Sequence, residues 1–304
     1  MRRPITYIVP VYNYGHFLPE AVASICSGNL QSADEILIVN DASTDNTADV
    51  MRVLAQENAQ IRLLAHRHNK GCSTAGYNTA IEAAKNGLFY GLAADNLLAA
   101  NSIDQLVQFM IQRKADVAAF QEVRFFTTDT NKPTHSWFFN SECTLADALS
   151  GHEWPGSSGH YLFTRESWLK AGRCDEFFGG LDSWAFGIRQ LATGSRMVTL
   201  EGSHYLHRWG HESLWCREAT KGELSLKAMR VLLPILNLLE EESVEYLFSP
   251  IGRTTWFENL KGYPLRVRDQ DLGKVGTIVR HHVEKDPLFK RLRRYLAGKL
   301  APVH

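Results

Sequence analysis

Four short polar segments follow four apolar runs in the first third of the chain, and they hold the residues best suited to bind a ligand. The segments are Tyr12-Asn13, Asn40-Asp41, His68-Asn69-Lys70-Gly71 and Asp95-Asn96. Carboxylate and amide oxygens accept hydrogen bonds from hydroxyl and N–H groups, and a carboxylate also binds hard cations such as Mg²⁺. The segments therefore predict a polar binding site if the fold brings them together.

The apolar runs before these segments are typical of buried β-strands, and a helical pattern separates each run from the next. The predicted strands cover residues 5–11, 35–39, 61–65 and 88–93. Four alternations of strand and helix within roughly 110 residues predict an α/β fold with a mainly parallel central sheet flanked by helices. Ligands bind beyond the carboxyl ends of the strands in such sheets, so we expect the polar segments to meet there.

The pattern changes after Asp116. Three more strands and two short helices are predicted, at residues 117–126, 157–164, 196–200, 165–171 and 182–191, with a polar connection at 127–140. After about residue 215 no strand is predicted, whereas residues 224–247 and 286–300 have helical periodicity. We therefore predict a first domain over residues 1–215 and a helical C-terminal extension over residues 216–304.

Composition excludes several classes of protein. Lys and Arg balance Asp and Glu at 33 each, which argues against a disordered chain and against nucleic acid bound over the whole surface. Five cysteines, never in CxxC spacing, favour neither a disulfide framework nor structural zinc. The N-terminal apolar run is too short for a secretory signal, and no run approaches the about 20 residues of a membrane span. A soluble, cytoplasmic protein is predicted.

Five ordered motifs resemble those of glycosyltransferase family 2. They are VPVYN, IVNDASTDNT, NKGCSTAGYN, LAADNLL and GLDSW, which begin at residues 9, 38, 69, 92 and 180. The resemblance covers roughly residues 5–215 and implies the GT-A fold and an enzyme that transfers a sugar from a nucleotide-diphosphate sugar with inversion. It also implies that the first four motifs surround this donor, through Pro10, Tyr12, Asn13, Asp41, Asn69, Gly71, Asn78 and Asp95.

Asp41 is the best candidate to hold the nucleotide, because a carboxylate at a strand end accepts hydrogen bonds from a ribose hydroxyl or a nucleobase N–H. The alternative is that Asp41 and Ser43 only stabilise an Asx-type turn. Lys70 can add positive charge near the diphosphate, and Gly71 allows close backbone approach. For Lys70 alone, a solvent-exposed turn before a helix is the simpler explanation.

Asp95 decides the question of a metal. The family's Asp-x-Asp motif places Mn²⁺ or Mg²⁺ against the diphosphate, but here the first aspartate is replaced by Ala93 and Asn96 follows Asp95. Either Asp95 holds the ion with help from a later residue, or cationic side chains such as Arg208 neutralise the diphosphate. His207 best resembles a late histidine that ligates metal in related glycosyltransferases. The alternative for His207 is a hydrogen-bonded histidine in a surface loop.

Asp182 is the predicted general base, since an inverting transferase needs one carboxylate near the acceptor hydroxyl. Its position before a helix also fits an N-cap, and both roles can hold together. The predicted function is sugar transfer to a glycan, such as a surface polysaccharide, or to a lipid-linked acceptor. The alternative is a catalytically degenerate nucleotide-sugar-binding protein, because the metal motif is reduced to Ala93-Ala94-Asp95-Asn96.

The end of the chain is basic. Residues 281–304 contain six Lys/Arg against two Asp/Glu, with leucines at helical spacing. A basic amphipathic helix can lie on an anionic membrane surface, close to a lipid-linked acceptor. The alternative is a solvated helix whose leucines pack on the core.

Overall fold

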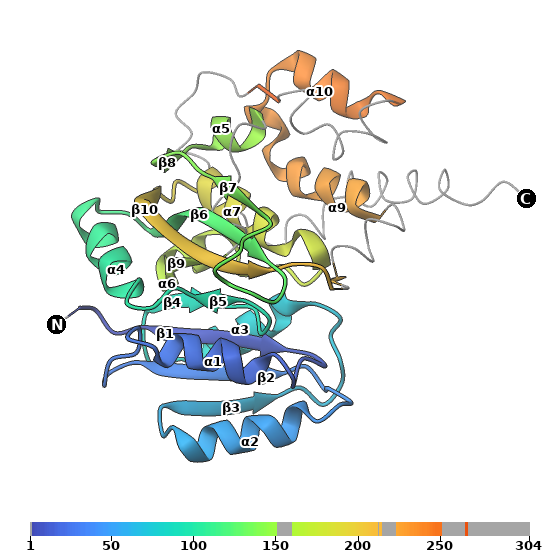
Figure 1. Cartoon of the computed structure of the whole chain (residues 1–304). Helices are drawn as coiled ribbons and strands as arrows, with labels where there is room; N and C mark the ends of the chain where they lie inside the picture. The colour runs from blue at the N-terminus through green and yellow to red at the C-terminus, as the bar shows by residue number, and fades with distance from the viewer. Residues whose placement is uncertain (1, 151–159, 212, 215–222, 251–264, 267–304) are drawn as a thin grey trace, which may run out of the picture.

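The computed structural model describes residues 2–150, 160–211, 213–214, 223–250 and 265–266. A mixed sheet of ten strands forms the centre of this part of the chain, and helices flank it (Figure 1). The strand order is β3-β2-β1-β4-β9-β6-β10-β5, with β7 added beside β6 and β8 beside β10. The predicted α/β class is therefore confirmed.

The first half of the sheet is parallel, as predicted. β1 pairs with β2 and β4, and β2 pairs with β3, all in parallel. Side chains of β1 and β2 alternate between two hydrophobic clusters, one on each face of the sheet. The bounds are β1 (Thr6–Val11), β2 (Glu35–Asn40), β3 (Ile61–Ala65), β4 (Leu88–Gly91), α1 (Leu18–Cys26), α2 (Thr47–Glu57), α3 (Ser73–Ala83) and α4 (Ile103–Gln112).

The second half of the sheet is mixed, because β9 runs antiparallel to both β4 and β6. β10 is longer than the predicted strand: it continues past a bulge between Leu200 and His204 and stays paired with β6. The predicted polar connection contains β7, which pairs with the other edge of β6. The bounds are β5 (Leu97–Leu98), β6 (Val117–Phe126), β7 (His135–Phe138), β8 (Glu142–Cys143), β9 (Tyr161–Thr164) and β10 (Met197–Arg208).

The described helices after β6 are α5 (Leu145–Ser150), α6 (Arg165–Lys170), η1 (Gly179–Leu181), α7 (Asp182–Ala192), α9 (Glu223–Leu232), η2 (Leu233–Leu238) and α10 (Glu241–Phe248). The helical pattern predicted at 224–247 is divided into three pieces. Pro234, which lacks an N–H, lies in the first turn of η2, and the extended backbone of Leu239 and Glu240 separates η2 from α10. Ala228 and Ile235 join the same hydrophobic cluster as Ala185 of α7.

The predicted domain boundary at residue 215 lies outside the described residues, and the division into two domains stays a prediction. The basic segment at 281–304 also lies outside them, so its predicted membrane contact is untested. Among the described helices, none combines the length and apolar character that crossing a bilayer requires.

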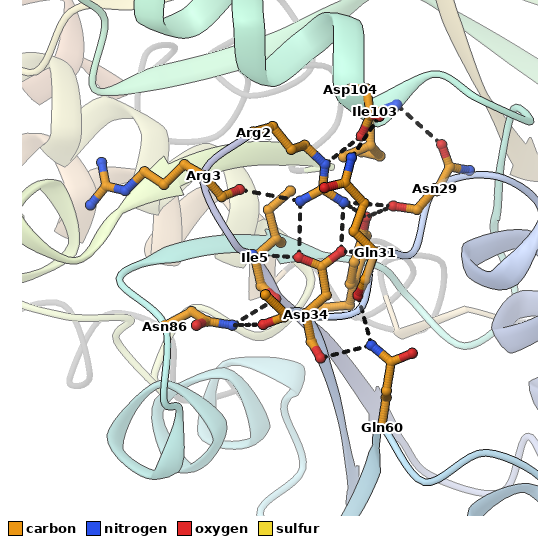
Figure 2. Close-up of polar contacts among 12 residues, drawn as sticks. Arg2, Arg3, Ile5, Asn29, Gln31, Asp34, Gln60, Asn86, Ile103 and Asp104 are labelled. Carbon is orange, nitrogen blue, oxygen red and sulfur yellow. Dashed lines mark hydrogen bonds and ion pairs between the residues drawn. The ribbon is translucent and has the colours of Figure 1, made fainter.

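A buried charge cluster ties the N-terminus to the amino ends of the strands (Figure 2). The Arg2 guanidinium donates to both oxygens of Asp34, at 2.9 and 2.5 Å, and also contacts Asp104. The side chains of Arg2 and Asp34 are almost fully buried, and the Asp34 carboxylate also accepts the N–H groups of Ile5 and Gln31. Because the cluster lies at the opposite end of the strands from the polar segments, its role is structural.

Replacing Arg2 should destabilise the fold without affecting chemistry at the other edge. We expect Arg2→Met to lower the free energy of unfolding by about 3–5 kcal/mol, because it leaves the Asp34 carboxylate buried without its cation. Urea unfolding measures this, with exposed Arg3→Met as the control, for which little change is expected. An Arg2→Met protein as stable as wild type would contradict this account of the cluster.

Candidate active site

The first corner of the site lies where β2 and β3 end. Asp41 is buried there, and its carboxylate accepts the Lys70 N–H at 3.0 Å from each oxygen. Its Oδ1 lies 2.6 Å from Nδ1 of His66, whose Nε2 lies 2.9 Å from the Thr79 hydroxyl. The Asn69 amide donates to the Asp41 carbonyl oxygen at 3.0 Å. Asp41 and the segment after β3 therefore form one unit.

The suggested Asx-type turn exists, but it belongs to the preceding residue. The Ser43 N–H donates to Oδ1 of Asn40 at 2.8 Å, so the Asp41 carboxylate is not used for that turn. His66 was not identified from the sequence. The available signal was strand register, because Asn40 pairs with Ala65 in the parallel sheet and the next residues, Asp41 and His66, then lie side by side.

The loop after β1 lies against the loop after β2. Asn13 has a left-handed backbone, with φ of 55°, and its Oδ1 accepts the Thr44 N–H at 2.7 Å. Its own N–H donates to the Ser43 hydroxyl at 3.0 Å. Tyr12 beside it is exposed. Asn13 thus fixes the two loops to each other, while Tyr12 is free to contact a ligand.

Two glycines shape the start of α3. A Cβ on Gly76 would lie 2.8 Å from Cβ of Pro10, so only glycine lets α3 pack this closely on β1. Gly71 has φ of 71° and open space around its Cα. The predicted pocket residues Pro10 and Gly71 therefore set the position of the helix and of the loop before it.

Asn78 has a different environment from the one predicted. Its Nδ2 donates to the Cys174 carbonyl at 2.8 Å, and its Oδ1 accepts the Cys174 N–H at 3.1 Å and the Trp168 indole N–H at 3.3 Å. The amide is buried and its hydrogen bonds are made within the protein. Asn78 thus joins α3 to the segment before η1 through hydrogen bonds within the protein.

The second corner of the site is Asp95, just beyond β4. Its Oδ2 lies 2.8 Å from Nε2 of His211, which follows β10. Burial raises the pKa of the Asp95 carboxyl, but the His211 hydrogen bond and the nearby His207 outweigh it and hold this pKa below its usual value. Asp95 is therefore an ionised carboxylate at neutral pH.

The predicted partner of Asp95 was His207, and the structure places His211 there instead. His207 Nδ1 lies 3.3 Å from the Tyr205 hydroxyl and 3.4 Å from Nδ2 of Asn96. Local sequence resemblance favoured His207. Which histidine meets Asp95 depends on where the chain turns after β10. The sequence pattern of a strand does not reveal that turn.

Asn96 has a structural role. Its Oδ1 accepts the Arg208 N–H at 2.9 Å, and its Nδ2 donates to Nε2 of His160 at 2.9 Å. His160 Nδ1 in turn faces the Gly91 carbonyl at 3.1 Å, which places the proton on Nδ1. Burial lowers the pKa of His160 and keeps it neutral. Asn96 thus links β10, through Arg208, to β4, through His160.

Arg208 also has a structural role. Its guanidinium donates to the Glu20 carboxylate at 2.5 Å, to the Asp95 carbonyl at 3.0 Å and to the Thr127 carbonyl at 3.2 Å. It also lies between the rings of Phe17 and Phe126. These contacts occupy the guanidinium N–H groups that a phosphate would need. Arg208 therefore supports the loop that carries Asp95.

The histidines next to Asp95 predict acid sensitivity. Burial, with the neighbouring His160, lowers the pKa of His207 from 6.5 to about 4. The unfolded chain therefore binds more protons than the folded protein between pH 6.5 and 4, and stability falls as the pH falls through this range. We expect His207→Asn to remove about 2 kcal/mol of the stability loss between pH 7.5 and 5.

Urea unfolding at the two pH values measures this difference. The exposed His68→Gln variant is the control and should keep the acid sensitivity of wild type. An unchanged pH dependence in His207→Asn would contradict the assignment of a neutral, buried imidazole.

The third corner of the site is Asp182, the first residue of α7. Its carboxylate contacts the Ser73 hydroxyl at the start of α3 and accepts the Ser183 N–H at 2.6 Å. It lines a small cavity together with Tyr77 of α3 and Tyr161 of β9. The N-cap alternative is not observed, because Asp182 lies within the first turn rather than at the cap position.

The segment 70–77, which contains the first turn of α3, connects the three corners. Asp41 binds the N–H of Lys70, and Asp182 contacts Ser73 three residues later. One turn further along, Tyr77 lies against Gly91 of β4, where an added Cβ would be 2.6 Å from its ring. Burial, then the negative charges of Asp182 and Asp95, raise the pKa of the Tyr77 hydroxyl. The three aspartates therefore surround one short segment.

The donor atoms around Asp95 fit a divalent cation only in part. Asp95 supplies a carboxylate oxygen and His211 an imidazole nitrogen, and Nδ1 of His211 is buried without a hydrogen-bond partner in the described structure. No third His, Cys, Asp or Glu joins them among the residues described. Mn²⁺ and Mg²⁺ often use one or two protein ligands, with phosphate and water as the rest. The pair fits an ion that binds together with a diphosphate.

Comparison with known proteins identifies the family. The model of "Glycosyl transferase family 2" matches residues 6–173. Glycosyltransferase GlyG of Streptococcus pneumoniae is 30% identical over 217 residues, which cover 68% of this chain and 71% of GlyG. The chain belongs to glycosyltransferase family 2. This glycosyltransferase is also 29% identical to EpsJ of Bacillus subtilis, an uncharacterized glycosyltransferase, over 69% of its own length but only 62% of EpsJ.

Solved structures confirm that this glycosyltransferase has the GT-A fold. Staphylococcus aureus TarS 1–349 in complex with UDP has a TM-score of 0.60 at 14% identity, covering 85% of this chain and 69% of the other. The mannosyltransferase PcManGT of Pyrobaculum calidifontis, in complex with GDP-Man and Mn²⁺, has a TM-score of 0.59 at 19% identity, covering 85% and 74%. At these identities the likeness is one of fold.

Proposed function

We propose that this glycosyltransferase moves a sugar from a nucleoside-diphosphate sugar to a glycan or lipid-linked acceptor with inversion at the anomeric carbon. The observation that carries the proposal is the convergence of three acids on the segment 70–77: Asp41 binds the Lys70 N–H, Asp182 contacts Ser73, and Asp95 follows β4, which packs against Tyr77. The three acids come from separate parts of the chain, and each is positioned for a different part of the substrates.

Asp41 is placed to hold the nucleoside. The bonds from Lys70 and His66 fix the orientation of its carboxylate, and its remaining lone pairs can accept from a ribose hydroxyl or a nucleobase N–H. Asn13 lies on the neighbouring loop and bonds to Thr44, and Tyr12 beside it is exposed, so both are available near the nucleoside. That the solved GT-A structures include complexes with UDP and GDP-Man supports this type of donor.

Asp95 and His211 are placed to face the diphosphate. A divalent cation, when bound, neutralises negative charge on the leaving diphosphate, and these two side chains would hold it. The single carboxylate predicts weaker metal binding than a full Asp-x-Asp motif. The N-terminus of α3 adds a favourable dipole for an anion, because its first N–H groups point away from the helix.

Asp182 is placed to act as the general base. It accepts the proton of the acceptor hydroxyl while that oxygen forms a bond to the anomeric carbon and the bond to the diphosphate oxygen breaks. Ser73 and Ser183 hold the carboxylate, so its orientation is set before the substrate arrives. The cavity that Asp182 lines with Tyr161 of β9 supports this role.

Turnover of a panel of mass-tagged nucleotide sugars tests the function. We expect one donor to be consumed, slowly by water alone and faster with an acceptor extract, with release of the nucleoside diphosphate. Product with inverted anomeric configuration, assigned by NMR coupling constants, supports the inverting mechanism. Retained configuration, or no turnover with any donor, would contradict the proposal.

Asp41→Asn should weaken nucleotide binding more than it affects folding. Hydrogen bonds to a charged group contribute about 1.5–3 kcal/mol, so we expect the Kd for the preferred nucleoside diphosphate to rise at least tenfold. Calorimetry with UDP and GDP measures this. Asp49→Asn is the matched control, since Asp49 is an exposed acid on α2. Equal affinity in wild type and Asp41→Asn would remove Asp41 from the nucleotide site.

A further inference from the structure

The strands β6 and β7 and the end of β10 run side by side (Figure 1). Aromatic side chains gather there on one face of the sheet. Phe125 pairs with His135 of β7 and with His207 of β10. Trp137 and Trp209 lie two positions further along their chains and share this face, because side chains alternate along a strand. We call His135, Trp137, His207 and Trp209 the aromatic shelf; they surround Phe125.

Ring contacts hold the shelf in place, and its two tryptophans are open to solvent. His135 stacks on the buried Phe125 with ring centroids 4.2 Å apart, and Trp137 meets the same ring at 4.6 Å. Trp209 lies 5.9 Å from Phe125 and 5.8 Å from His135, edge-on to both. Nevertheless Trp137 and Trp209 remain 43% and 45% exposed. Side chains held in place like this lose little entropy when a ligand covers them.

The shelf is continuous with the active site. Trp209 precedes His211 by two residues, and His211 contacts Asp95. In the strand order, β6 and β10 lie beyond β4 and β9, on the other side from the strands that hold Asp41. Asp182 lines its cavity with Tyr161 of β9, so in the strand order it lies on the same side of β4 as the shelf, but Tyr161 and Phe125 pack on opposite faces of the sheet. Along the strand order, the shelf therefore lies on the same side of Asp95 as the proposed general base, away from Asp41.

We propose that the aromatic shelf is a saccharide subsite that holds a sugar ring of a glycan acceptor; this rests on the proposed function. The C–H face of a pyranose is apolar and slightly positive, and it covers the negative face of an indole ring well. The imidazole of His135 adds a polar group that can hydrogen-bond to a sugar hydroxyl. Sites of this kind combine aromatic walls with a few polar groups.

A lipid surface fits this region less well than a saccharide does. Phe138 is 69% exposed but lies on the opposite face of β7 from Trp137. That opposite face carries the ion pair between Glu122 and Arg124, at 2.8 Å, and Ser136. The exposed aromatic residues therefore form no single apolar patch that could enter a membrane.

Binding of tetrasaccharides in the absence of donor tests the subsite. The probes are tetramers of glucose, N-acetylglucosamine, galactose and mannose, measured by saturation-transfer NMR and calorimetry on the full chain. We expect at least one to bind wild type, with Kd raised on the order of tenfold by Trp137→Ala and by Trp209→Ala. Trp→Phe at either position should recover most of the affinity, which excludes misfolding as the cause.

Phe138→Ala is the matched control, because it removes a more exposed ring from the other face of the same strand, and it should bind like wild type. The proposal is overturned if no tetrasaccharide binds wild type, or if the tryptophan variants bind equally well. It is also overturned if phosphatidylglycerol vesicles bind and this binding is lost in both Trp137→Ala and Phe138→Ala. Because no donor is present, saccharide binding without any donor turnover would reject the proposed function alone.

Discussion

Asp182→Asn should strongly lower the rate of sugar transfer while leaving donor binding intact. Asn keeps the size of the side chain and can still accept the Ser183 N–H, but it cannot take a proton from the acceptor. General base catalysis contributes about 10²–10⁴-fold, so we expect kcat to fall by that factor. Initial rates of acceptor glycosylation and calorimetric titration with the nucleoside diphosphate measure the two properties separately.

Glu176 provides the matched control for this prediction. Its charge, like that of Asp182, acts on the buried Cys72 thiol, whose pKa is raised by burial and by both carboxylates. Glu176 is thus another acid near the start of α3, but its side chain is exposed. It lies before η1, whereas Asp182 begins α7. Glu176→Gln should retain transfer. If Glu176→Gln is inactive and Asp182→Asn is active, the base has been assigned to the wrong residue.

Asp95→Asn should have the second largest effect. The substitution removes the carboxylate that contacts His211, and with it the negative charge that would hold a cation against the diphosphate. Loss of one group that stabilises developing charge typically lowers kcat about 10²–10³-fold, and we expect a loss in this range. The Mn²⁺-dependent part of the thermal shift produced by the nucleoside diphosphate should disappear as well.

The same thermal-shift measurement decides between the two histidines. His211→Gln should lose the Mn²⁺ response, whereas His207→Gln should keep it, because only His211 contacts Asp95 directly. His204→Gln serves as a further control, since His204 lies beside Arg124 at 3.2 Å on the other face of β10. Loss of the Mn²⁺ response in His207→Gln but not in His211→Gln would restore the pairing predicted from the sequence.

The order of strands and helices in the first half of the chain was predictable from the sequence. β1 to β4 and their helices form where apolar runs and helical spacing indicated, because buried strands and amphipathic helices leave regular local patterns. The local sequence patterns do not predict β7, and they predict a strand that is shorter than β10. Their residues alternate irregularly, and pairing with β6 rather than local propensity determines them.

The sequence by itself determined the family, the parallel half of the sheet and the loops that carry Asp41 and Asp95. Only the tertiary structure decided which side chains meet. Asp41 with His66, Asp95 with His211, Asp182 with Ser73 and the rings around Phe125 are contacts between separate segments, up to 116 residues apart. Such contacts follow from strand order and register, and these depend on how the whole chain packs. Motifs within one short segment therefore do not reveal them.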